Sequence, residues 1–152
     1  MTGGPGATES EVAEALYALL TAVVRRTPRD LSLTALSTLG TLARSGPRRI
    51  TDLAAVEGVT QPAMTSMVTK LAAAGHVVRR RHASDGRVAL VEITDAGADY
   101  VAGRQREGAA ELAVLVSKLS PAAAAALARA VPGLRELVEL DTEERDPADE
   151  RR

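Results

Sequence analysis

The stretch from Thr60 to Gly75, TQPAMTSMVTKLAAAG, carries the signals of one complete helix. The Thr60 hydroxyl can cap a helix, Pro62 falls in the first turn, where its missing N–H costs nothing, and Gly75 can take the left-handed conformation that ends the helix. Four apolar residues recur at helical spacing and share one stripe: Met64, Met67, Val68 and Leu71. The sequence therefore predicts an amphipathic helix with this stripe buried.

The opposite face of this helix carries no carboxylate. It is made of small or uncharged residues and one lysine: Pro62, Thr65, Ser66 and Thr69, with Gln61, Ala63 and Lys70 at its margins. Hydroxyl and amide groups bond phosphate oxygens and base edges, and a Thr methyl or an Ala contacts a thymine methyl. This face suits a polyanion, although an ordinary exposed helix is the alternative that this feature alone leaves open.

The residues before Thr60 predict a shorter helix and a tight turn. Ile50 is interpreted as a brief extended piece, Thr51 as the cap of a helix over residues 52–57, and Gly58 as its left-handed end. After Gly75 the apolar residues alternate, which predicts two strands, residues 77–81 and 88–93, around an Asp-Gly turn. The order is helix, turn, helix and two-stranded hairpin.

Arginine is concentrated in this hairpin. Arg79, Arg80 and Arg81 lead into its turn, and Arg87 leaves it. Guanidinium groups clamp phosphates and enter narrow, electronegative minor grooves. Asp85 is interpreted as structural, capping the turn and pairing with a neighbouring Arg. A solvated charge run is the alternative, but the neighbouring carboxylate-free helix favours a nucleic-acid partner.

Periodicity predicts four further helices, over residues 9–26, 32–44, 95–119 and 121–140. Thr94 should cap the third of these, and Pro132-Gly133 should kink or split the last. Residues 1–8 and the acidic residues 142–152 are expected to be disordered, which leaves 9–141 as a single domain. We expect a mainly α (α+β) fold, a winged helix-turn-helix with a two-stranded wing and flanking N- and C-terminal helices.

Composition narrows the function classes. Apolar residues make up 45% of the 152, but Phe and Trp are absent, and this thin core predicts burial against a partner. Cys is absent and no apolar stretch is long enough to cross a bilayer, so we expect a cytoplasmic protein without membrane contact. The net charge of −1 conceals eight basic against three acidic residues between Leu42 and Leu90.

Catalytic chemistry finds no support in the sequence. There is no phosphate loop, no G-x-S-x-G and no H-E-x-x-H motif, and the only two histidines are His76 and His82. His76 is most simply a packing residue near a strand, and His82 with Asp85 offers too few ligands for a metal. We therefore expect no enzyme, no cofactor and no metal.

Several segments resemble one family. Asp85-Gly86-Arg87 followed by Ile93-Thr94-Asp95-Ala96-Gly97 is similar to the D-x-R-x-x-x-x-x-L-T-x-x-G signature of the MarR (multiple antibiotic resistance regulator) family, with Ile at the Leu position. The segments 50–54, 59–65 and 75–79, together with Leu71, follow in the order and spacing of that family. The resemblance covers residues 31–97 and extends to the flanking helices only by length and periodicity.

The resemblance implies a homodimeric DNA-binding regulator, with residues 9–30 and 98–141 as a dimerisation lobe and 31–97 as a winged helix-turn-helix lobe. It places DNA contacts at these residues: Thr60, Gln61, Pro62, Ala63, Thr65, Ser66, Thr69, Lys70 and Arg87. From the arginine-rich hairpin we expect Arg79 and Arg81 to contact DNA as well. Members often have Arg where Ser66 stands, so base reading here rests more on Thr, Gln and DNA shape. A two-fold dimer needs a pseudo-palindromic operator.

Release of repression by a small lipophilic or phenolic effector is also implied. Tyr17 and Tyr100 are the candidate ligand contacts, although core-edge positions are the commoner role for such residues. The rival to DNA binding is a winged-helix module whose Arg-rich wing grips an acidic protein. Preference for duplex DNA, rather than salt dependence, separates these two functions.

Overall fold

A small antiparallel sheet organises the described part of the chain, which in the computed structural model comprises residues 7–26, 30–81 and 89–145. Strands β2 (Val77–Arg81) and β3 (Ala89–Ile93) form the expected hairpin, with Val77 opposite Ile93 and Arg79 opposite Val91. A third strand, β1 (Arg48–Arg49), pairs with β3 on its other side. The two-stranded wing is therefore confirmed, and β1 adds a third strand where only a brief extended piece at Ile50 was expected from the sequence.

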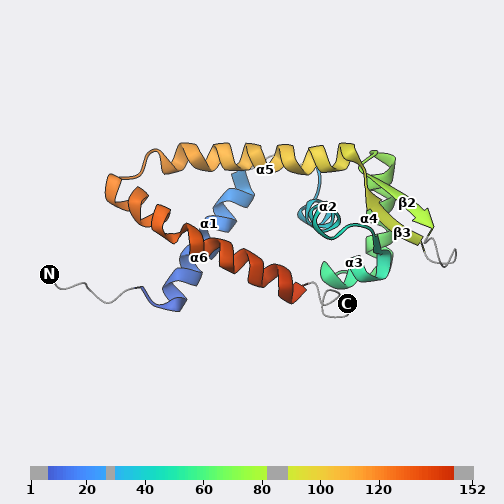
Figure 1. Ribbon diagram of the computed structural model, residues 1–152, viewed down its shortest axis with the longest axis horizontal. Helices are drawn as coiled ribbons and strands as arrows, with labels where there is room; N and C mark the ends of the chain where they lie inside the picture. The colour runs from blue at the N-terminus through green and yellow to red at the C-terminus, as the bar shows by residue number, and fades with distance from the viewer. Residues whose placement is uncertain (1–6, 27–29, 82–88, 146–152) are drawn as a thin grey trace. The chain divides into compact units, whose positions relative to one another are not determined.

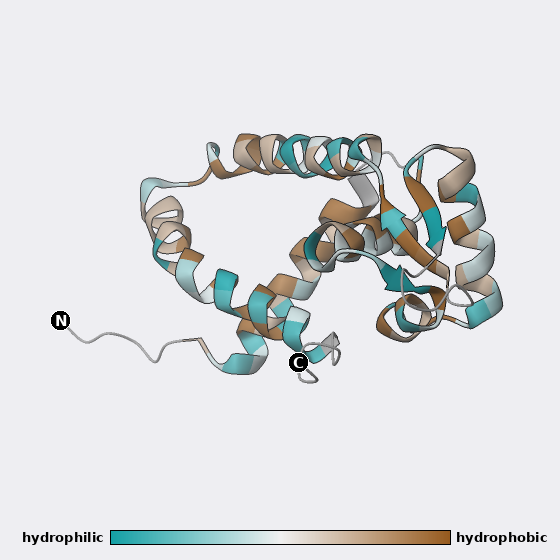
Figure 2. Ribbon diagram, turned by 45° about the vertical axis from the view of Figure 1, so that its right-hand side comes forward, coloured by the Kyte–Doolittle hydropathy of each residue, from teal (hydrophilic) through white to brown (hydrophobic). Residues whose placement is uncertain are grey.

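Four helices pack against or beside this sheet: α2 (Leu33–Ser45), α3 (Ile50–Val56), α4 (Gln61–Ala73) and the beginning of α5 (Asp95–Val116). Figure 1 shows these elements gathered at the N-terminal end of α5. Hydrophobic residues lie where the elements meet (Figure 2). The apolar side chains that are almost completely buried come from these elements: Leu39, Leu42, Leu53, Met64, Val68, Leu71, Val77 and Val91.

The start of α3 differs from the prediction. Ile50 is the first helical residue rather than an extended one, and Arg49 occupies the N-cap without a capping side chain. Thr51 therefore lies inside the helix, where its hydroxyl contacts Asp52 Oδ1 at 3.2 Å. Pairing of Arg48 and Arg49 with β3 moves the extended segment two residues upstream, and Gly58 then ends the turn at φ 63°, as expected.

The junction between the sheet and α5 is tightly built. Thr94 caps α5 by accepting a hydrogen bond from the Gly97 N–H at 3.0 Å, and its hydroxyl donates to the Gly75 carbonyl at 2.7 Å. A Cβ at Gly97 would lie 2.2 Å from the His76 carbonyl oxygen and 2.9 Å from Ile93 Cγ1. Only glycine fits this approach, which ties α5 to the start of the wing.

The last helix, α6 (Pro121–Arg145), runs without interruption through Pro132. Of the two outcomes predicted at Pro132-Gly133, a kink or a split, the split was therefore wrong. Residues 142–145 are helical although the sequence placed them in the tail. The preceding helix α5 ends at Val116, three residues before the predicted end. No residue from Ala102 to Glu144 is buried.

Residues 1–32 form a compact unit separate from residues 33–152. Within it, α1 (Glu9–Arg26) has the expected bounds and begins with a reciprocal cap. The Thr8 N–H donates to Glu11 Oε2 at 2.7 Å, and the Glu11 N–H donates to Thr8 Oγ1 at 3.3 Å. The Thr8 N–H, together with the Thr8 hydroxyl that donates to Glu11 Oε2 at 2.9 Å, lowers the pKa of the Glu11 carboxyl below its usual value.

Candidate nucleic-acid interface

The residues predicted to begin α4, Thr60 as the cap and Pro62 in the first turn, do so in the structure. Thr60 Oγ1 accepts a hydrogen bond from the Ala63 N–H at 3.4 Å, and Pro62 lies in the first turn. Gly75 follows the C-cap with φ 79°. Local signals therefore fix both ends of the helix.

The two faces of α4 differ in burial as predicted. Met64, Val68 and Leu71 are at most 1% exposed, while Met67 is only half-buried. The polar face, defined here as Gln61, Pro62, Ala63, Thr65, Ser66, Thr69 and Lys70, is exposed except for the half-buried Thr65. No Asp or Glu occurs in Gln61–Ala73, so nothing on the helix itself repels a phosphate backbone.

The threonine hydroxyls on this face are already engaged as donors. Thr65 Oγ1 donates to the Gln61 carbonyl at 2.9 Å, and Thr69 Oγ1 donates to the Thr65 carbonyl at 2.8 Å. Thr65 therefore offers an acceptor oxygen and a methyl group rather than a donor. Within the described ranges, the side chains of Gln61, Ser66 and Lys70 make no hydrogen bond or ion pair, which leaves them available to a ligand.

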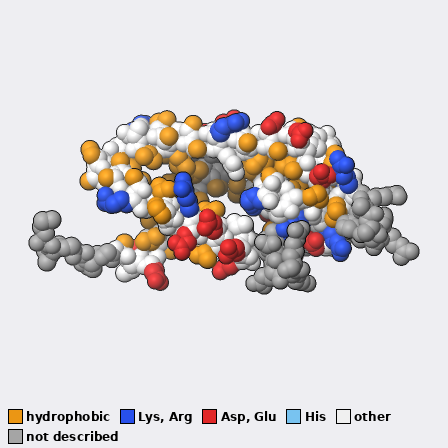
Figure 3. Space-filling view, viewed as in Figure 1, with side chains coloured by type: hydrophobic (Ala, Val, Ile, Leu, Met, Phe, Trp, Pro, Cys, Tyr) orange, Lys and Arg blue, Asp and Glu red, His pale blue; other side chains and the backbone are white. Residues whose placement is uncertain are grey.

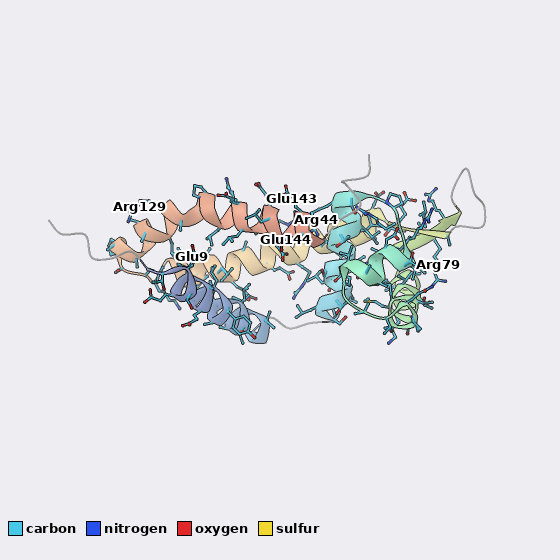
Figure 4. The ribbon with its side chains drawn as sticks, turned by 90° about the horizontal axis from the view of Figure 1, so that it is seen from below. Glu9, Arg44, Arg79, Arg129, Glu143 and Glu144 are labelled. Carbon is cyan, nitrogen blue, oxygen red and sulfur yellow. The ribbon has the colours of Figure 1, made fainter. Side chains whose placement is uncertain are left out.

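The arginines of β2 point to different neighbours. Arg79 Nη2 donates to Thr69 Oγ1 at 2.8 Å and to the Thr65 carbonyl at 3.4 Å, and Figure 4 shows Arg79 beside α4. Arg80 forms an ion pair with Glu92 on the neighbouring strand. Neither contact was predicted from the sequence. The side chain of Arg81, and the whole of Asp85 and Arg87, lie outside the described residues.

Strand parity is the signal that could have located Arg79. Val77 and Arg79 are two residues apart and therefore lie on the same face of β2. Val77 is buried, and β2 packs against α4. An arginine two positions further along the same face meets the edge of that helix.

The two tyrosines named as ligand contacts have different surroundings. Tyr17 lies on α1 and is 74% exposed. Tyr100 lies on α5, half-buried, with its ring centroid 4.8 Å from that of His76. His76 Nδ1 is buried and has no hydrogen-bond partner among the residues described. The expected packing role of His76 fits this contact, whereas the effector role of the tyrosines remains a prediction.

The described residues offer no candidate for a metal site or a membrane-spanning helix. They contain no group of three or more His, Asp or Glu residues that could hold a metal ion. None of their helices combines the length and the hydrophobicity needed to cross a membrane.

Residues 31–89 match the MarR family model, which covers the helix-turn-helix and the beginning of β3. The chain carries a MarR-family domain. An HTH-type transcriptional regulator from Mycobacterium tuberculosis is 39% identical over 82 residues, which are 54% of this chain. This chain spans 57% of the length of that relative.

Solved structures support the MarR-type winged-helix fold. The crystal structure of RV1404 from Mycobacterium tuberculosis aligns over 89% of this chain and 97% of that protein, with a TM-score of 0.71 and 24% identity. FabT from Streptococcus pneumoniae, solved in complex with DNA, aligns over 87% of this chain and 98% of that protein, with a TM-score of 0.58 and 18% identity. At these identities the likeness shows the fold alone.

Proposed function

We propose that this protein is a transcriptional regulator that binds duplex DNA sequence-specifically through the polar face of α4. One observation carries the proposal: α4 has a polar face without a carboxylate, its opposite side is buried through Met64, Val68 and Leu71, and it lies next to an arginine-rich strand. The buried stripe holds the helix rigidly, as sequence reading requires. The MarR-family domain and the DNA complex of FabT, a protein of the same fold, support this choice over catalysis.

Specific residues take separate roles in this proposal. Gln61, Thr65 and Ser66 face base edges, with Thr60, Pro62 and Ala63 against bases or adjacent backbone. Lys70 contacts phosphate, and Arg81 and Arg87 extend the contact from the wing, Arg87 into the minor groove. The acceptor oxygen and methyl of Thr65 suit a base-edge amino group or a thymine methyl better than a phosphate oxygen.

A homodimer is part of the proposal because the long helices expose apolar side chains. Ten large residues of α5, α6 and their connection are at least 37% exposed: Val114, Leu115, Val116, Leu119, Leu127, Val131, Leu134, Leu137, Val138 and Leu140. Figure 3 shows hydrophobic side chains along the surface of these helices. Exposed apolar surface of this extent is typical of an interface, and a two-fold dimer presents two copies of α4 to a pseudo-palindromic operator.

Selection from a pool of random duplexes, followed by sequencing, tests the proposal. We expect enrichment of an inverted repeat with half-sites about one helical turn, roughly 34–36 Å, apart. Competition with polyglutamate separates the rival function, because a module for acidic proteins would release DNA to polyglutamate at equal charge. Failure to enrich any duplex at low ionic strength would contradict the proposal.

Regulation completes the proposal. The protein acts as a repressor, and a small lipophilic or phenolic molecule releases it, with Tyr17 and Tyr100 as contacts. This part is supported by the family resemblance alone. A reporter promoter carrying the selected duplex should lose expression when the protein is present and regain it with a phenol that raises the melting temperature. Activation of the reporter, or no response to any ligand tried, would contradict it.

A further inference from the structure

Arg79 connects the wing to α4 through a specific pair of hydrogen bonds. Its Nη2 reaches Thr69 Oγ1 at 2.8 Å, which is an optimal distance for a charged donor, and the Thr65 carbonyl at 3.4 Å. Helix α4 and strand β2 are linked covalently only by residues 74–76. The side-chain contact is therefore a second tie between the two elements, further along the strand.

The contact continues along the helix. Thr69 Oγ1 accepts from Arg79 and donates to the Thr65 carbonyl at 2.8 Å, while Thr65 Oγ1 donates to the Gln61 carbonyl at 2.9 Å. A series of hydrogen bonds thus runs from β2 to the first turn of α4. We call Arg79, Thr69 and Thr65 the Arg79 clasp.

We propose that Arg79 is a positioning residue for sequence reading: through the Arg79 clasp it fixes the rotation of α4 relative to the wing, rather than contacting phosphate. The proposal rests on the proposed DNA-binding function. Core packing beneath Met64, Val68 and Leu71 sets the depth of the helix. The clasp acts on its outer edge, where a small rotation would displace Gln61 and Ser66 from base edges.

The neighbouring Arg80 provides a matched control. It carries the same charge one residue away, but it lies on the other face of the strand and pairs with Glu92. Arg80→Gln therefore removes the same charge as Arg79→Gln without touching α4. Thr69→Val removes the acceptor of the clasp at nearly constant volume and changes no charge.

The first measurement is the ratio of dissociation constants for the selected duplex and a shuffled duplex. We expect Arg79→Gln and Thr69→Val each to reduce this ratio about five- to tenfold, the double variant to lose no more than either, and Arg80→Gln to leave it unchanged. Arg79→Lys, which keeps the charge but not the planar fork, should also reduce it. The slope of log affinity against log salt concentration should stay at the wild-type value for Thr69→Val. It should be the same for Arg79→Gln as for Arg80→Gln.

A phosphate contact at Arg79 gives the opposite pattern and would overturn the proposal. Arg79→Gln would then weaken both duplexes equally and lower the salt slope by about 0.9 relative to Arg80→Gln, while Thr69→Val would have no effect.

Hydrogen exchange without DNA keeps the two proposals separate. Arg79→Gln and Thr69→Val should accelerate amide exchange in α4, whereas Arg80→Gln should not. Unchanged exchange in the clasp variants would refute the clasp even if DNA binding is established. Accelerated exchange together with no binding of any duplex by the wild type would leave the clasp as a structural tie, and the positioning role would fail with the proposed function.

Discussion

Residues 33–101 and residues 102–145 are built on opposite principles. The first region buries a compact apolar core from α2, α3, α4 and the sheet, and the N-terminal end of α5 closes it with Gly97 and Val101. The second consists of the rest of α5, a short connection and α6, with no buried residue up to Glu144. The described part of the winged region therefore buries an apolar core of its own, whereas the long helices leave large apolar side chains exposed.

We expect the largest loss of stability from a substitution where α5 meets the start of the wing. Gly97→Ala would place a methyl group 2.2 Å from the His76 carbonyl oxygen. Because this atom belongs to the backbone, relieving the clash requires moving the main chain. We expect the free energy of unfolding to fall by about 3 kcal/mol, measured by urea denaturation. Gly103→Ala is the matched control on the same helix, since its Cβ meets nothing within 4 Å and should leave stability equal or slightly higher. Equal stability of the two variants would contradict the close approach.

The next effect separates the two regions. Val138 on α6 is 67% exposed, so Val138→Glu should leave the winged core folded. If α6 forms the proposed dimer interface, a buried carboxylate there should raise the dimer dissociation constant more than tenfold in sedimentation equilibrium. A charge reversal on the exposed face of α4, Lys70→Glu, lies outside this surface and should change the dissociation constant far less. A Val138→Glu chain that associates as well as the wild type would remove α6 from the interface.

We expect a smaller loss of stability when the cap of α5 is removed. Thr94→Ala removes the acceptor for the Gly97 N–H and the donor to the Gly75 carbonyl, and should cost about 1 kcal/mol. Thr51→Ala tests the position that the sequence wrongly nominated as a cap. Because Arg49 holds the N-cap of α3, that variant should stay within about 0.5 kcal/mol of the wild type. Calorimetric melting of both variants decides between the two positions.

The sequence predicts features that depend on neighbouring residues and misses those that depend on residues far along the chain. The caps at Thr60 and Thr94 and the left-handed turns at Gly58 and Gly75 depend on neighbouring residues, and the structure confirms them. Strand β1 has only two residues and no apolar period of its own. It exists because Arg48 and Arg49 meet β3, about forty residues away, and no local pattern reports that.

The candidate site shows the same division. The buried stripe of α4 was predicted from helical spacing, and the structure bears out the burial of Met64, Val68 and Leu71 but leaves Met67 half-buried. The partners of Arg79 and Arg80 were not predicted. The sequence of an arginine run is the same whether its side chains contact a helix, a carboxylate or solvent. Strand parity distinguishes them once the neighbouring helix is known. The contact of His76 with Tyr100 likewise depends on packing across α5.

The most direct test of the central claim, that the polar face of α4 reads DNA sequence, is the affinity ratio of Gln61→Ala. Gln61 is exposed and makes no hydrogen bond through its side chain to any described residue, so its removal should not disturb the fold. We predict that the ratio between the selected and shuffled duplexes narrows about tenfold, while Lys70→Ala weakens both duplexes alike. Equal weakening of both duplexes by Gln61→Ala, or no change, would contradict the claim.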